Sequence, residues 1–481
     1  MPSSICRPVP FLIVFIFASV SLSGQPIRES LTLASSLGNV RTLSLEGSER
    51  ISGLYRFDVR VETAPGTRVS FDALLGEQMR VAMRQADGSV RFFSGICSRV
   101  SQGSDGVLKL ELVPQIWLLT RRSGSRIFQD MSVPQIIESV LEESGVDLQM
   151  NIQGSHPARP CVVQYNESDF EFISRLMEDE GIFYFFMQSA DGAILVVSGP
   201  PGTHPGIPGT SLVPFNPKPG TRSEVVTGWD KSQEIRSGRV TLRDSTFALP
   251  GNPLEASAVI QDSVAVGGVT HRLRTQSSEA LDLYEYPGEY AQRFDDTDSS
   301  AGAIVAEGER TAAIRMQQEA VNALSIRGAS TVGRLAAGHR FSLGGHGDAD
   351  GAYVLTSVQH SARTGVEDGG VEYNNTFTCI PAGLPFRPQR LTAPPVLAGL
   401  HPATVAGPPG ERVHTDGEGR VKVKFPWDRE SAGNEDSSCW VGVAARPGED
   451  ATIPEIGDEV LVAFMHGDPD RPIIVGSVPD R

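Results

Sequence analysis

The chain has 481 residues, 40% hydrophobic and 21% charged, a balance that excludes a disordered protein and a length that excludes a single hydrophobic core. Its formal net charge of −16 makes long-range attraction to phosphate groups weak, which argues against a nucleic-acid-binding protein. The 50 glycines, 33 prolines and many short apolar runs favour a β-rich chain with tight turns.

Residues 1–26 form a leader-like segment. A single Arg precedes an apolar run from Phe11 to Val20, and small residues follow it, as in a secretory signal. The run is too short for a membrane-spanning helix. A start codon chosen too far upstream explains the pattern equally well, so both interpretations stay open, and we expect the fold to begin near Ile27.

Strand patterns dominate the next part of the chain. Apolar and polar residues alternate at 41–47, 54–62 and 87–100, and a longer strand is predicted from Gly106 to about Trp117. This two-residue period is typical of half-buried strands, so the folded region is predicted to open with β-structure.

Two helices carry capping signals. Ser132 precedes Pro134 and an apolar stripe, and Gly145 supplies the stop signal. Ser168 is followed three residues later by Glu171, which is the spacing of a capping box, and then by a second apolar stripe. Both helices are therefore predicted to bury one face.

Further strands and one helix follow. The aromatic residues at 183–186 suggest either a cofactor pocket or a buried strand, and the strand is preferred because aromatic residues favour strands. A hairpin turn is predicted at 191–192. A Pro/Gly-rich passage at 199–220 separates two regions, after which we expect one helix within 300–328 and a hairpin at 338–363.

The chain is predicted to end in a small barrel. A linker with four prolines and no periodicity, residues 384–398, separates a main region at 27–383 from a C-terminal region at 399–481. The C-terminal region holds five short strand candidates, which suggest a five-stranded barrel of the OB type. These candidates lie at 402–406, 420–425, 439–444, 459–465 and 473–478.

One barrel strand invites a functional interpretation. Apolar residues alternate with two lysines at 421–425, so this strand is either a nucleic-acid platform or a barrel wall. Residues 411–481 hold 8 Lys or Arg against 15 Asp or Glu, a net charge of −7, whereas a nucleic-acid-binding barrel is usually basic. We therefore expect the apolar residues to fill the barrel and Lys422 and Lys424 to face outward. Trp427 is expected to close the barrel end rather than to stack on a ligand.

The cysteines do not form a zinc motif. They are scattered, without CxxC or Cys/His spacing, at Cys6, Cys97, Cys161, Cys379 and Cys439. Cys97, Cys379 and Cys439 lie in apolar runs and are predicted to be buried free thiols. This prediction fits folding in a reducing, cytoplasmic environment.

One candidate metal site combines two histidines with two aspartates near a hairpin tip: His346, His360, Asp348 and Asp350. No third ligand has a fixed spacing, so hydrogen-bonded histidines in a solvated loop are the preferred interpretation.

Two acidic clusters have similarly simple explanations. Glu178, Asp179 and Glu180 form a charged helix end, for which exposure to solvent is the default. Residues 467–472 fit a hairpin turn better than an ion site. No catalytic, cofactor-binding or metal-ligating residue is therefore predicted, and we expect a protein that is not an enzyme.

Several segments resemble one known family. The segments DGEGRVKVKFPWDRE, SSCWVGVA and IPEIGDEVLVAFMHGDPDRPIIVGSV resemble the OB-fold domain of VgrG proteins, the tip-spike components of type VI secretion systems. Those proteins are similar to the hub and spike proteins of contractile phage tails. The family's hub region is resembled by RIFQDMSVPQIIESVLEESGV, VQYNESDFEFISRLMEDEGIFYFF, RVTLRDSTF, YEYPGEY and GHRFSLGGHGDADGAYVLTSVQH. These segments keep the family's order from about Arg41 to Val478, which makes the resemblance specific.

The resemblance implies a mainly β fold with a few helices. A phage tail hub-like region at 27–383, with two related barrel-type subdomains, would precede the OB-fold barrel at 399–481. The implied role is that of a non-enzymatic spike that caps the tube of a contractile injection machine, helps to puncture membranes and delivers effectors.

The resemblance also implies partners. They are two further copies of the chain in a homotrimer, a hexameric tube protein (Hcp-like), a PAAR-type tip protein, effectors and baseplate components. Nucleic acid, cofactors and metals are not expected, and the membrane is touched only during injection. Family members assemble in the cytoplasm and leave by contraction, so we expect the chain to stay cytoplasmic until then.

The chain departs from the family pattern in places. Asn166 and Pro426 replace an Arg and an aromatic or His that the family commonly has, which affects local packing. Family members usually continue into a triangular β-helix needle, whereas this chain ends at Arg481. A natural short form, a split gene product and a truncation all explain the missing needle, and the three interpretations stay open. The alternatives are an OB-fold protein that binds nucleic acid or carbohydrate and, favoured by the leader, a secreted hydrolase.

Overall fold

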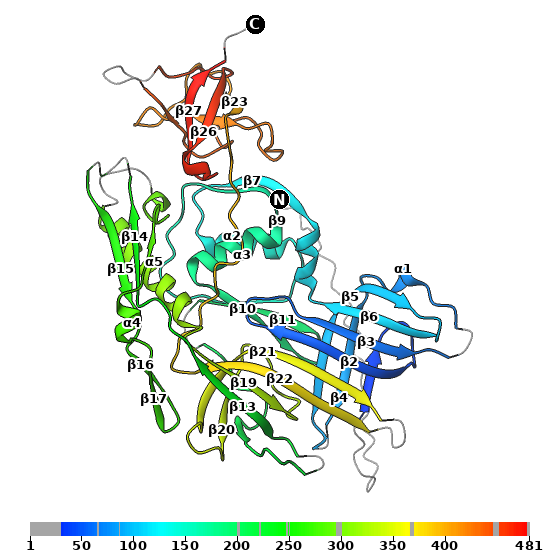
Figure 1. Cartoon of the computed structure of the whole chain (residues 1–481). Helices are drawn as coiled ribbons and strands as arrows, with labels where there is room; N and C mark the ends of the chain where they lie inside the picture. Colours follow the sequence, from blue (N-terminus) through cyan, green and yellow to red (C-terminus); the bar gives the residue numbers. More distant parts are fainter. Residues whose placement is uncertain are drawn as a thin grey trace, which may run out of the picture.

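The computed structural model describes residues 30–64, 67–85, 87–199, 203–220, 223–246, 249, 251–294, 301–365, 370–445 and 452–478. The leader-like residues 1–26 lie outside this set. No helix within it is both long and apolar enough to cross a membrane. Figure 1 shows a large lower part made of strands, a layer of helices above it, and a small β unit on top. We call residues 30–383 the body and residues 399–478 the barrel.

An antiparallel β lobe opens the body. It contains β1 (Ser30–Ala34), β2 (Arg41–Arg50), β3 (Arg56–Glu62), β4 (Gln78–Arg84), β5 (Val90–Gln102), β6 (Val107–Val113) and the short helix α1 (Phe71–Leu74). Side chains alternate between buried and exposed, as in β3, where Phe57, Val59 and Val61 point inward. Strand β6 ends at Val113, earlier than predicted, because Pro114 cannot donate a ladder hydrogen bond. The 3-10 helix η1 (Gln115–Arg121) follows it.

The helical layer comes next in the chain. It contains β7 (Ser123–Phe128), α2 (Val133–Glu142), β8 (Leu148–Asn151), β9 (Val162–Ser168), α3 (Asp169–Glu180), β10 (Phe183–Gln188) and β11 (Ala193–Ser198). Ser132 is the N-cap of α2, and Ser168 and Glu171 form the predicted capping box of α3. The aromatic run is the largely buried strand β10, paired with β11, so the strand interpretation is confirmed.

A second β lobe completes the body. Its strands are β12 (Leu212–Pro214), β13 (Val226–Gln233), β14 (Arg239–Asp244), β15 (Leu254–Val259), β16 (Ser263–Val266), β17 (Val269–Arg272), β18 (Asp282–Glu285), β19 (Leu324–Ser330), β20 (Arg340–Gly344), β21 (Gly351–Thr364) and β22 (Val371–Pro381). Its helices are α4 (Gln276–Glu279), η2 (Ala291–Arg293) and α5 (Ala301–Ala320). Helix α5, the helix predicted within 300–328, packs on β14 and β15. The predicted hairpin at 338–363 is formed by β20 and β21.

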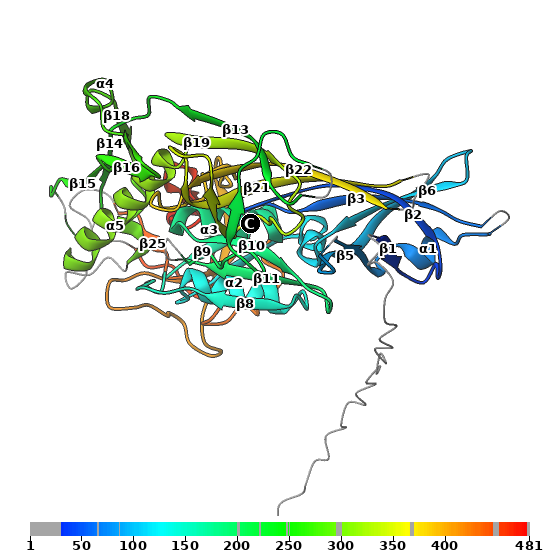
Figure 2. The same ribbon diagram turned by 90° about the horizontal axis from the view of Figure 1, so that it is seen from below.

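One 12-stranded sheet joins the two lobes. Its order is β1-β4-β5-β6-β3-β2-β21-β22-β19-β13, with β20 and β12 attached beside β21. The joint is the antiparallel β2–β21 pair, which runs from Ser44 opposite Arg363 to Arg50 opposite Ser357. Figure 2 shows β2, β3, β21 and β22 as long neighbouring strands across the body. The two lobes therefore share a continuous sheet.

The barrel contains all five predicted strands, and three of them, β24, β25 and β26, are shorter than expected. They are β23 (His401–Ala406), β24 (Lys422–Lys424), β25 (Gly442–Val443), β26 (Glu459–Phe464), which runs into η4 (Met465–Gly467), and β27 (Pro472–Ser477). The sheet order is β24-β23-β26-β27-β25, and a bridge between Val421 and Val441 curls its two edges toward each other. The predicted fold class, mainly β with a small five-stranded barrel at the end, is confirmed.

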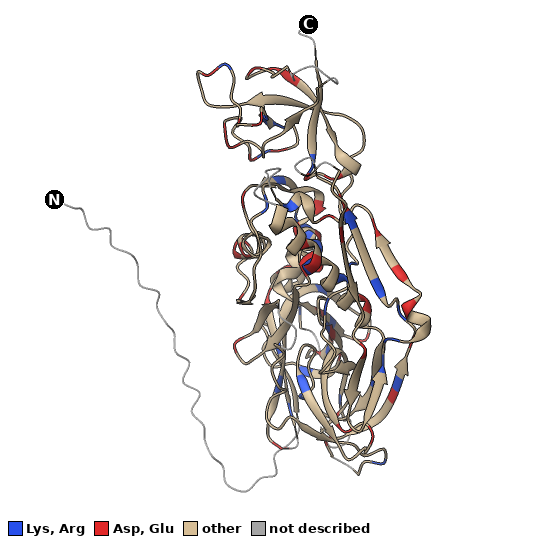
Figure 3. Ribbon diagram, turned by 90° about the vertical axis from the view of Figure 1, so that its left-hand side faces the viewer, with Lys and Arg blue, Asp and Glu red and all other residues tan. Residues whose placement is uncertain are grey.

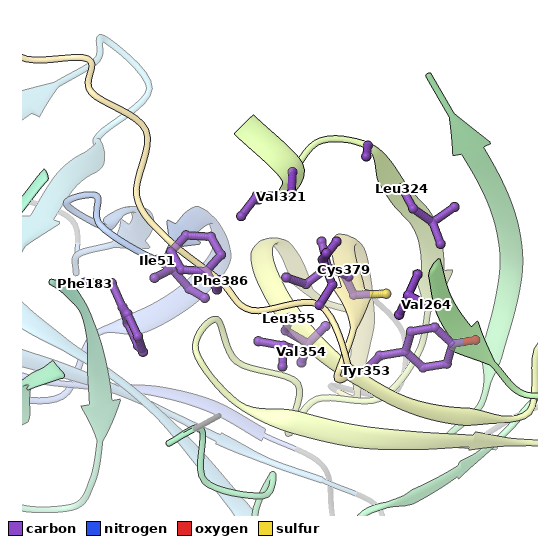
Figure 4. Close-up of a cluster of buried hydrophobic side chains, with 14 of the residues drawn as sticks. Ile51, Phe183, Val264, Val321, Leu324, Tyr353, Val354, Leu355, Cys379 and Phe386 are labelled. Carbon is purple, nitrogen blue, oxygen red and sulfur yellow. The ribbon is translucent and has the colours of Figure 1, made fainter. Parts of the chain in front are cut away.

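Three buried apolar clusters stabilise these parts. Figure 4 shows the second lobe, where Phe183 and Phe386 approach one side of a cluster that includes Leu355 and Cys379. The first lobe and the helical layer share another cluster, which contains Cys97. The barrel has its own cluster, in which Val421, Val423 and Phe425 are at most 2% exposed, as predicted. Cys97, Cys379 and Cys439 are all buried, which confirms that prediction too.

Candidate functional site at the junction of body and barrel

The barrel stands on the helical layer, where a segment without helix or strand leads up to it past α3 (Figure 1). Glu178, near the end of α3, holds this segment in place. One carboxylate oxygen accepts hydrogen bonds from the backbone N–H groups of Leu391 and Thr392, both at 2.9 Å. The other accepts from the Thr392 hydroxyl at 3.0 Å. Three hydrogen bonds to one carboxylate therefore fix the direction from which the chain enters the barrel.

The neighbouring acid Asp179 is enclosed by arginines. Its Oδ2 accepts from Arg293 at 2.6 Å and from Arg159 at 3.0 Å, and its Oδ1 accepts from Arg315 at 2.6 Å. Burial alone would raise the pKa of Asp179, but the charges of Arg293 and Arg315 hold that pKa well below its usual value. Asp179 is therefore a charged anchor between α3 and the segments η2 and α5.

Glu180 belongs to the same network. Its side chain is 2% exposed and accepts hydrogen bonds from Arg310 at 2.6 Å and from Arg159. His156 lies 3.0 Å from the same carboxylate. Burial opposes ionisation, yet the bond with His156 and the charge of Arg159 lower the pKa of Glu180 far below its usual value. The prediction of a solvated helix end is therefore wrong, because arginines from distant segments cover it. Figure 3 shows blue (Lys, Arg) and red (Asp, Glu) segments side by side in the helical part below the barrel.

Lys422 connects the barrel to the body. Its Nζ donates to Oε1 of Gln129 at 2.8 Å and lies 4.9 Å from the ring centroid of Trp440. Gln129 in turn donates to the backbone carbonyl of Asp436 at 2.7 Å. Lys422 is only 9% exposed, so the prediction that it faces solvent is wrong: the body covers that side of the strand. Lys424, also predicted to face outward, is half-buried.

An aromatic contact adds to the junction. Trp427 stacks on Phe425 with ring centroids 4.8 Å apart, beside the barrel core, as the expected closing residue would. It also meets Tyr165 of β9 edge-on at 5.4 Å. The end of the barrel that Trp427 covers is therefore the end that touches the body.

The turn between β26 and β27 carries another junction contact. Residues 467–472 form the predicted turn between two antiparallel strands. Asp470 accepts a hydrogen bond from the backbone N–H of Val163 at 2.6 Å. Burial, followed by the negative charge of Asp468, raises the pKa of Asp470 to about 7. The junction therefore contains an acid that changes its charge near neutral pH.

Two cavities flank these contacts. One has a volume of about 350 Å³ and is lined by residues of both parts, among them Gln129, Cys161, Lys422 and Cys439. The other, of about 250 Å³, lies between the α3 network and the β26–β27 turn. Within the described part of the chain, no three His, Cys, Asp or Glu side chains are arranged to hold a metal ion.

The structure separates the histidines that were considered as metal ligands. The backbone N–H of His346 donates to Asp350 at 2.7 Å, which closes the β20–β21 turn. His360 lies within β21 and is hydrogen-bonded to Glu49 at 3.2 Å and to Tyr373 at 2.7 Å. His360 is hydrogen-bonded as expected, but it is 2% exposed, so the solvated-loop interpretation is wrong for this residue.

Two family descriptions match the chain in succession. Residues 48–366 match the phage tail baseplate hub (GPD), which is more than half of the chain. The chain belongs to the phage tail baseplate hub family. Residues 411–478 of this hub protein match the type VI secretion system/phage-baseplate injector OB domain, which is the barrel.

Individual relatives agree with the family assignment. The type VI secretion system spike protein VgrG1c of Pseudomonas aeruginosa is 37% identical, over 90% of this hub protein and 59% of the relative. The actin cross-linking toxin VgrG1 of Vibrio cholerae is 31% identical, over 88% of this chain and 38% of the toxin. The chain thus spans less than two thirds of the length of these relatives. The predicted resemblance to VgrG proteins is confirmed.

A solved structure supports the fold. It is the E. coli c3393 protein, described as a type VI secretion component with structural similarity to the T4 tail proteins gp27 and gp5. It superposes on this hub protein with a TM-score of 0.64 at 22% identity, covering 93% of this chain and 100% of that one. The arrangement of a hub followed by an OB barrel is therefore shared.

Proposed function

We propose that the chain is a structural tip-spike component of a type VI secretion (contractile injection) machine. It caps the tube, helps to puncture the target membrane and carries effectors. The observation behind this proposal is the succession of a baseplate hub and an injector OB domain along one chain. We also propose the boundaries given by the sequence: hub at 27–383, linker at 384–398 and OB barrel at 399–481.

The junction suits a part that carries load. A spike driven forward by contraction must pass force from hub to tip without bending between them. Asp470 and Lys422 bond to the body from the barrel, and Glu178 fixes the connecting segment. These contacts come from separate segments of the barrel and the linker, so together they resist both tilting and rotation.

The proposed partners follow from this role. Three copies form a homotrimer that sits on a hexameric Hcp-like tube protein, and a PAAR-type tip protein and effectors ride on it within a baseplate. Assembly takes place in the cytoplasm, before secretion. The proposal is non-enzymatic: the toxin relative matches over 38% of its own length, so its name is not carried over to this chain.

The nucleic-acid alternative is not favoured. Lys422, the residue that suggested a platform for phosphate, is covered by the body and bonded to Gln129. The acidic barrel lacks the excess of cations that counterion release requires.

The mass of the assembled protein tests the proposal. Light scattering on the purified chain at micromolar concentration should give three times 51.6 kDa. Dissociation should also lower the stability of the fold, since obligate interfaces are large and apolar. A stable monomer under these conditions contradicts the proposed assembly.

A further inference from the structure

Strand β18 forms an unpaired edge that carries exposed apolar side chains. It pairs with β14 on one side, and within the described part of the chain no strand pairs with its other side. Figure 2 labels β18 at the rim of the body, beside α4. Along the strand and at its two ends, four large apolar residues are 40–58% exposed: Leu281, Leu283, Tyr284 and Tyr286.

The linker continues this apolar surface. Arg390 forms an ion pair with Glu285 at 3.1 Å, which places the next residue, Leu391, beside the end of β18. Leu391 is 72% exposed, and Val396, farther along the linker, is 70% exposed. The backbone N–H of the residue after Val396 donates to the carbonyl of Gly467 in the barrel at 2.8 Å. The linker therefore runs from the end of β18 to the barrel with apolar side chains in solvent.

The barrel meets the same surface. The rings of Tyr286 and His466 have centroids 6.1 Å apart. His466, Val396 and Arg390 line the cavity of about 250 Å³ together with Pro287, which follows Tyr286. These contacts join body, linker and barrel into one surface. We call its six exposed apolar residues the β18 patch: Leu281, Leu283, Tyr284, Tyr286, Leu391 and Val396.

A surface of this kind is unfavourable in water. The free edge of a strand presents backbone N–H and C=O groups to any other strand nearby. Contiguous exposed apolar side chains mark an interaction site, whereas single ones need no explanation. The β18 patch combines both features, so we expect a partner to cover it.

Charge indicates which partner fits. The chain has a formal net charge of −16, so two copies repel each other wherever their acids are unpaired. Beside the patch, Glu285 and Glu289 are both paired with Arg390 at 3.1 Å. Two copies can therefore approach here without bringing unpaired acids together. A partner that carries phosphate would need free cations, and Arg390 is already occupied.

The extent of the patch favours the same partner. Because the patch reaches from the body along the linker to the barrel, whatever covers it must contact both parts at once. In a ring of identical chains, each neighbour has its own body and its own barrel at the matching heights. A second copy of the chain therefore meets this requirement.

We propose that the β18 patch is a contact between copies of this chain, in which a neighbouring copy covers the free edge of β18. The inference rests on the proposed function, which supplies the homotrimer, and it adds the surface through which the subunits meet. In a cyclic trimer every copy presents this patch to a neighbour.

Nitration of tyrosines in the full-length wild-type protein tests the proposal. Tyr284 and Tyr286 are 58% and 52% exposed, and the other six of the eight tyrosines are buried or half-buried. Nitration by tetranitromethane is mapped by peptide mass spectrometry, with the urea-unfolded chain as reference. In the assembled protein Tyr284 and Tyr286 should be protected, although both are exposed in the single chain. This measurement needs no variant, so it is decisive even where a substitution impairs folding.

Matched variants test the same surface by mass. Leu391→Glu puts an unpaired charge into the covered patch and should weaken the assembly by about 100-fold or more. Light scattering at micromolar concentration should then give a mass close to 51.6 kDa, the mass of one chain. Leu212→Glu makes the same replacement at a leucine of β12 that is 58% exposed outside the patch, and it should keep the mass of three chains.

A second variant guards against a local effect in the linker. Tyr284→Glu changes the strand instead and should dissociate the assembly as Leu391→Glu does. In both variants Tyr286 should become open to nitration. Both replaced side chains are more than half-exposed, so the far-UV circular dichroism of the variants should match that of the wild type.

The outcomes separate this inference from the proposed function. A wild-type monomer would overturn the proposed assembly and the inference with it. A trimer in which Tyr284 and Tyr286 are nitrated as fast as in urea would leave the assembly standing and overturn the inference, because the patch would then be free for a different partner. Trimers that persist in Leu391→Glu and Tyr284→Glu, or equal dissociation by Leu212→Glu, would also overturn it.

Discussion

Two pairs of acids at the junction have pKa values that are shifted in opposite directions. Asp179 and Glu180 close helix α3, and Asp468 and Asp470 lie in the β26–β27 turn. Glu180 is buried, and the other three acids are half-buried. The pKa values of the first pair are lowered and those of the second are raised. Burial raises the pKa in all four cases, so burial does not explain the difference.

The number of nearby arginines explains it. Asp179 and Glu180 share four arginines within hydrogen-bonding distance: Arg159, Arg293, Arg310 and Arg315. Asp470 feels Arg175 and Arg159 only from farther away, and the charge of Asp468 works against it. An acid surrounded by cations stays charged when buried, whereas two acids facing each other compete for one charge.

The two pairs should therefore respond to pH in opposite ways. The folded pKa values of Asp179 and Glu180 lie below the unfolded ones, so their stabilisation is present at neutral pH and is lost as the pH falls below about 4. The folded pKa of Asp470 lies above the unfolded one, so its carboxylate weakens the fold at high pH. That loss diminishes as the pH falls below about 7 and is gone only below about 4, where the carboxyl of the unfolded chain is protonated as well.

The largest change in the free energy of unfolding is expected when one of the arginines around Asp179 and Glu180 is removed. Arg293 is 3% exposed and bonds to Asp179 and Glu307, both at 2.6 Å. In Arg293→Met both carboxylates keep their charge in a buried site, so the free energy of unfolding should fall by about 3–5 kcal/mol. Urea unfolding at neutral pH measures this. If the loss in the free energy of unfolding is smaller than the loss on removing an exposed ion pair, the network is solvated and the argument fails.

Removing a charge from the second pair should raise the free energy of unfolding instead of lowering it. Asp470→Asn removes a charge but leaves an amide oxygen that can accept from Val163, so the variant should be more stable than the wild type by about 2–3 kcal/mol near pH 8. The groups that face Asp470 are Asp468, Arg175, Arg159 and the backbone of Val163. The difference should shrink as the pH falls below about 7 and vanish near pH 4 or below, where the carboxyl is protonated in the unfolded chain as well. Equal differences at both pH values would contradict the raised pKa.

Glu178 provides an intermediate case, because its partners are neutral groups of the linker. Glu178→Ala should lower the free energy of unfolding by about 1–2 kcal/mol, since three hydrogen bonds to one carboxylate are lost. Trypsin should cut after Arg390 several-fold faster, because the linker is released. Glu138, exposed on α2, supplies the matched control, and Glu138→Ala should leave the cleavage rate unchanged.

The smallest effect is expected at an exposed pair. Arg363 lies 3.4 Å from Glu46 with side-chain exposures of 71% and 47%. Arg363→Met should change the free energy of unfolding by less than about 1 kcal/mol, because water screens both charges. It is also the control for Arg293→Met, since both replace Arg by Met. A loss as large as that of Arg293→Met would mean that the screening argument fails.

Local signals in the sequence predicted the elements of the fold. The capping box of Ser168 and Glu171, the five barrel strands and the inward residues Val421 and Val423 all depend on spacings of a few residues. Strand β6 was predicted too long because its pattern continues past Pro114, where the ladder has to stop.

The junction was not predictable from such signals. The alternation around Lys422 shows that its side chain points away from the barrel core. It does not show that the body covers that side of the strand. The arginines around Asp179 come from three separate segments, and no spacing connects them. One signal was available: α5 carries Glu307, Arg310 and Arg315 among apolar residues, which is unusual for a face that packs on a sheet.

The pairing of β2 with β21 sets a condition on the timing of folding. All six strands of the first lobe have been synthesised once the ribosome reaches Val113. One edge of β2, however, can be paired only by residues 357–363, which are synthesised much later. Until the ribosome has released them, that edge presents free backbone groups to any other strand nearby. Contacts between such distant residues also slow folding, because a long loop must close first. A nascent chain truncated before Gly351 should therefore bind chaperones or aggregate, whereas one that includes β21 can close its own edge.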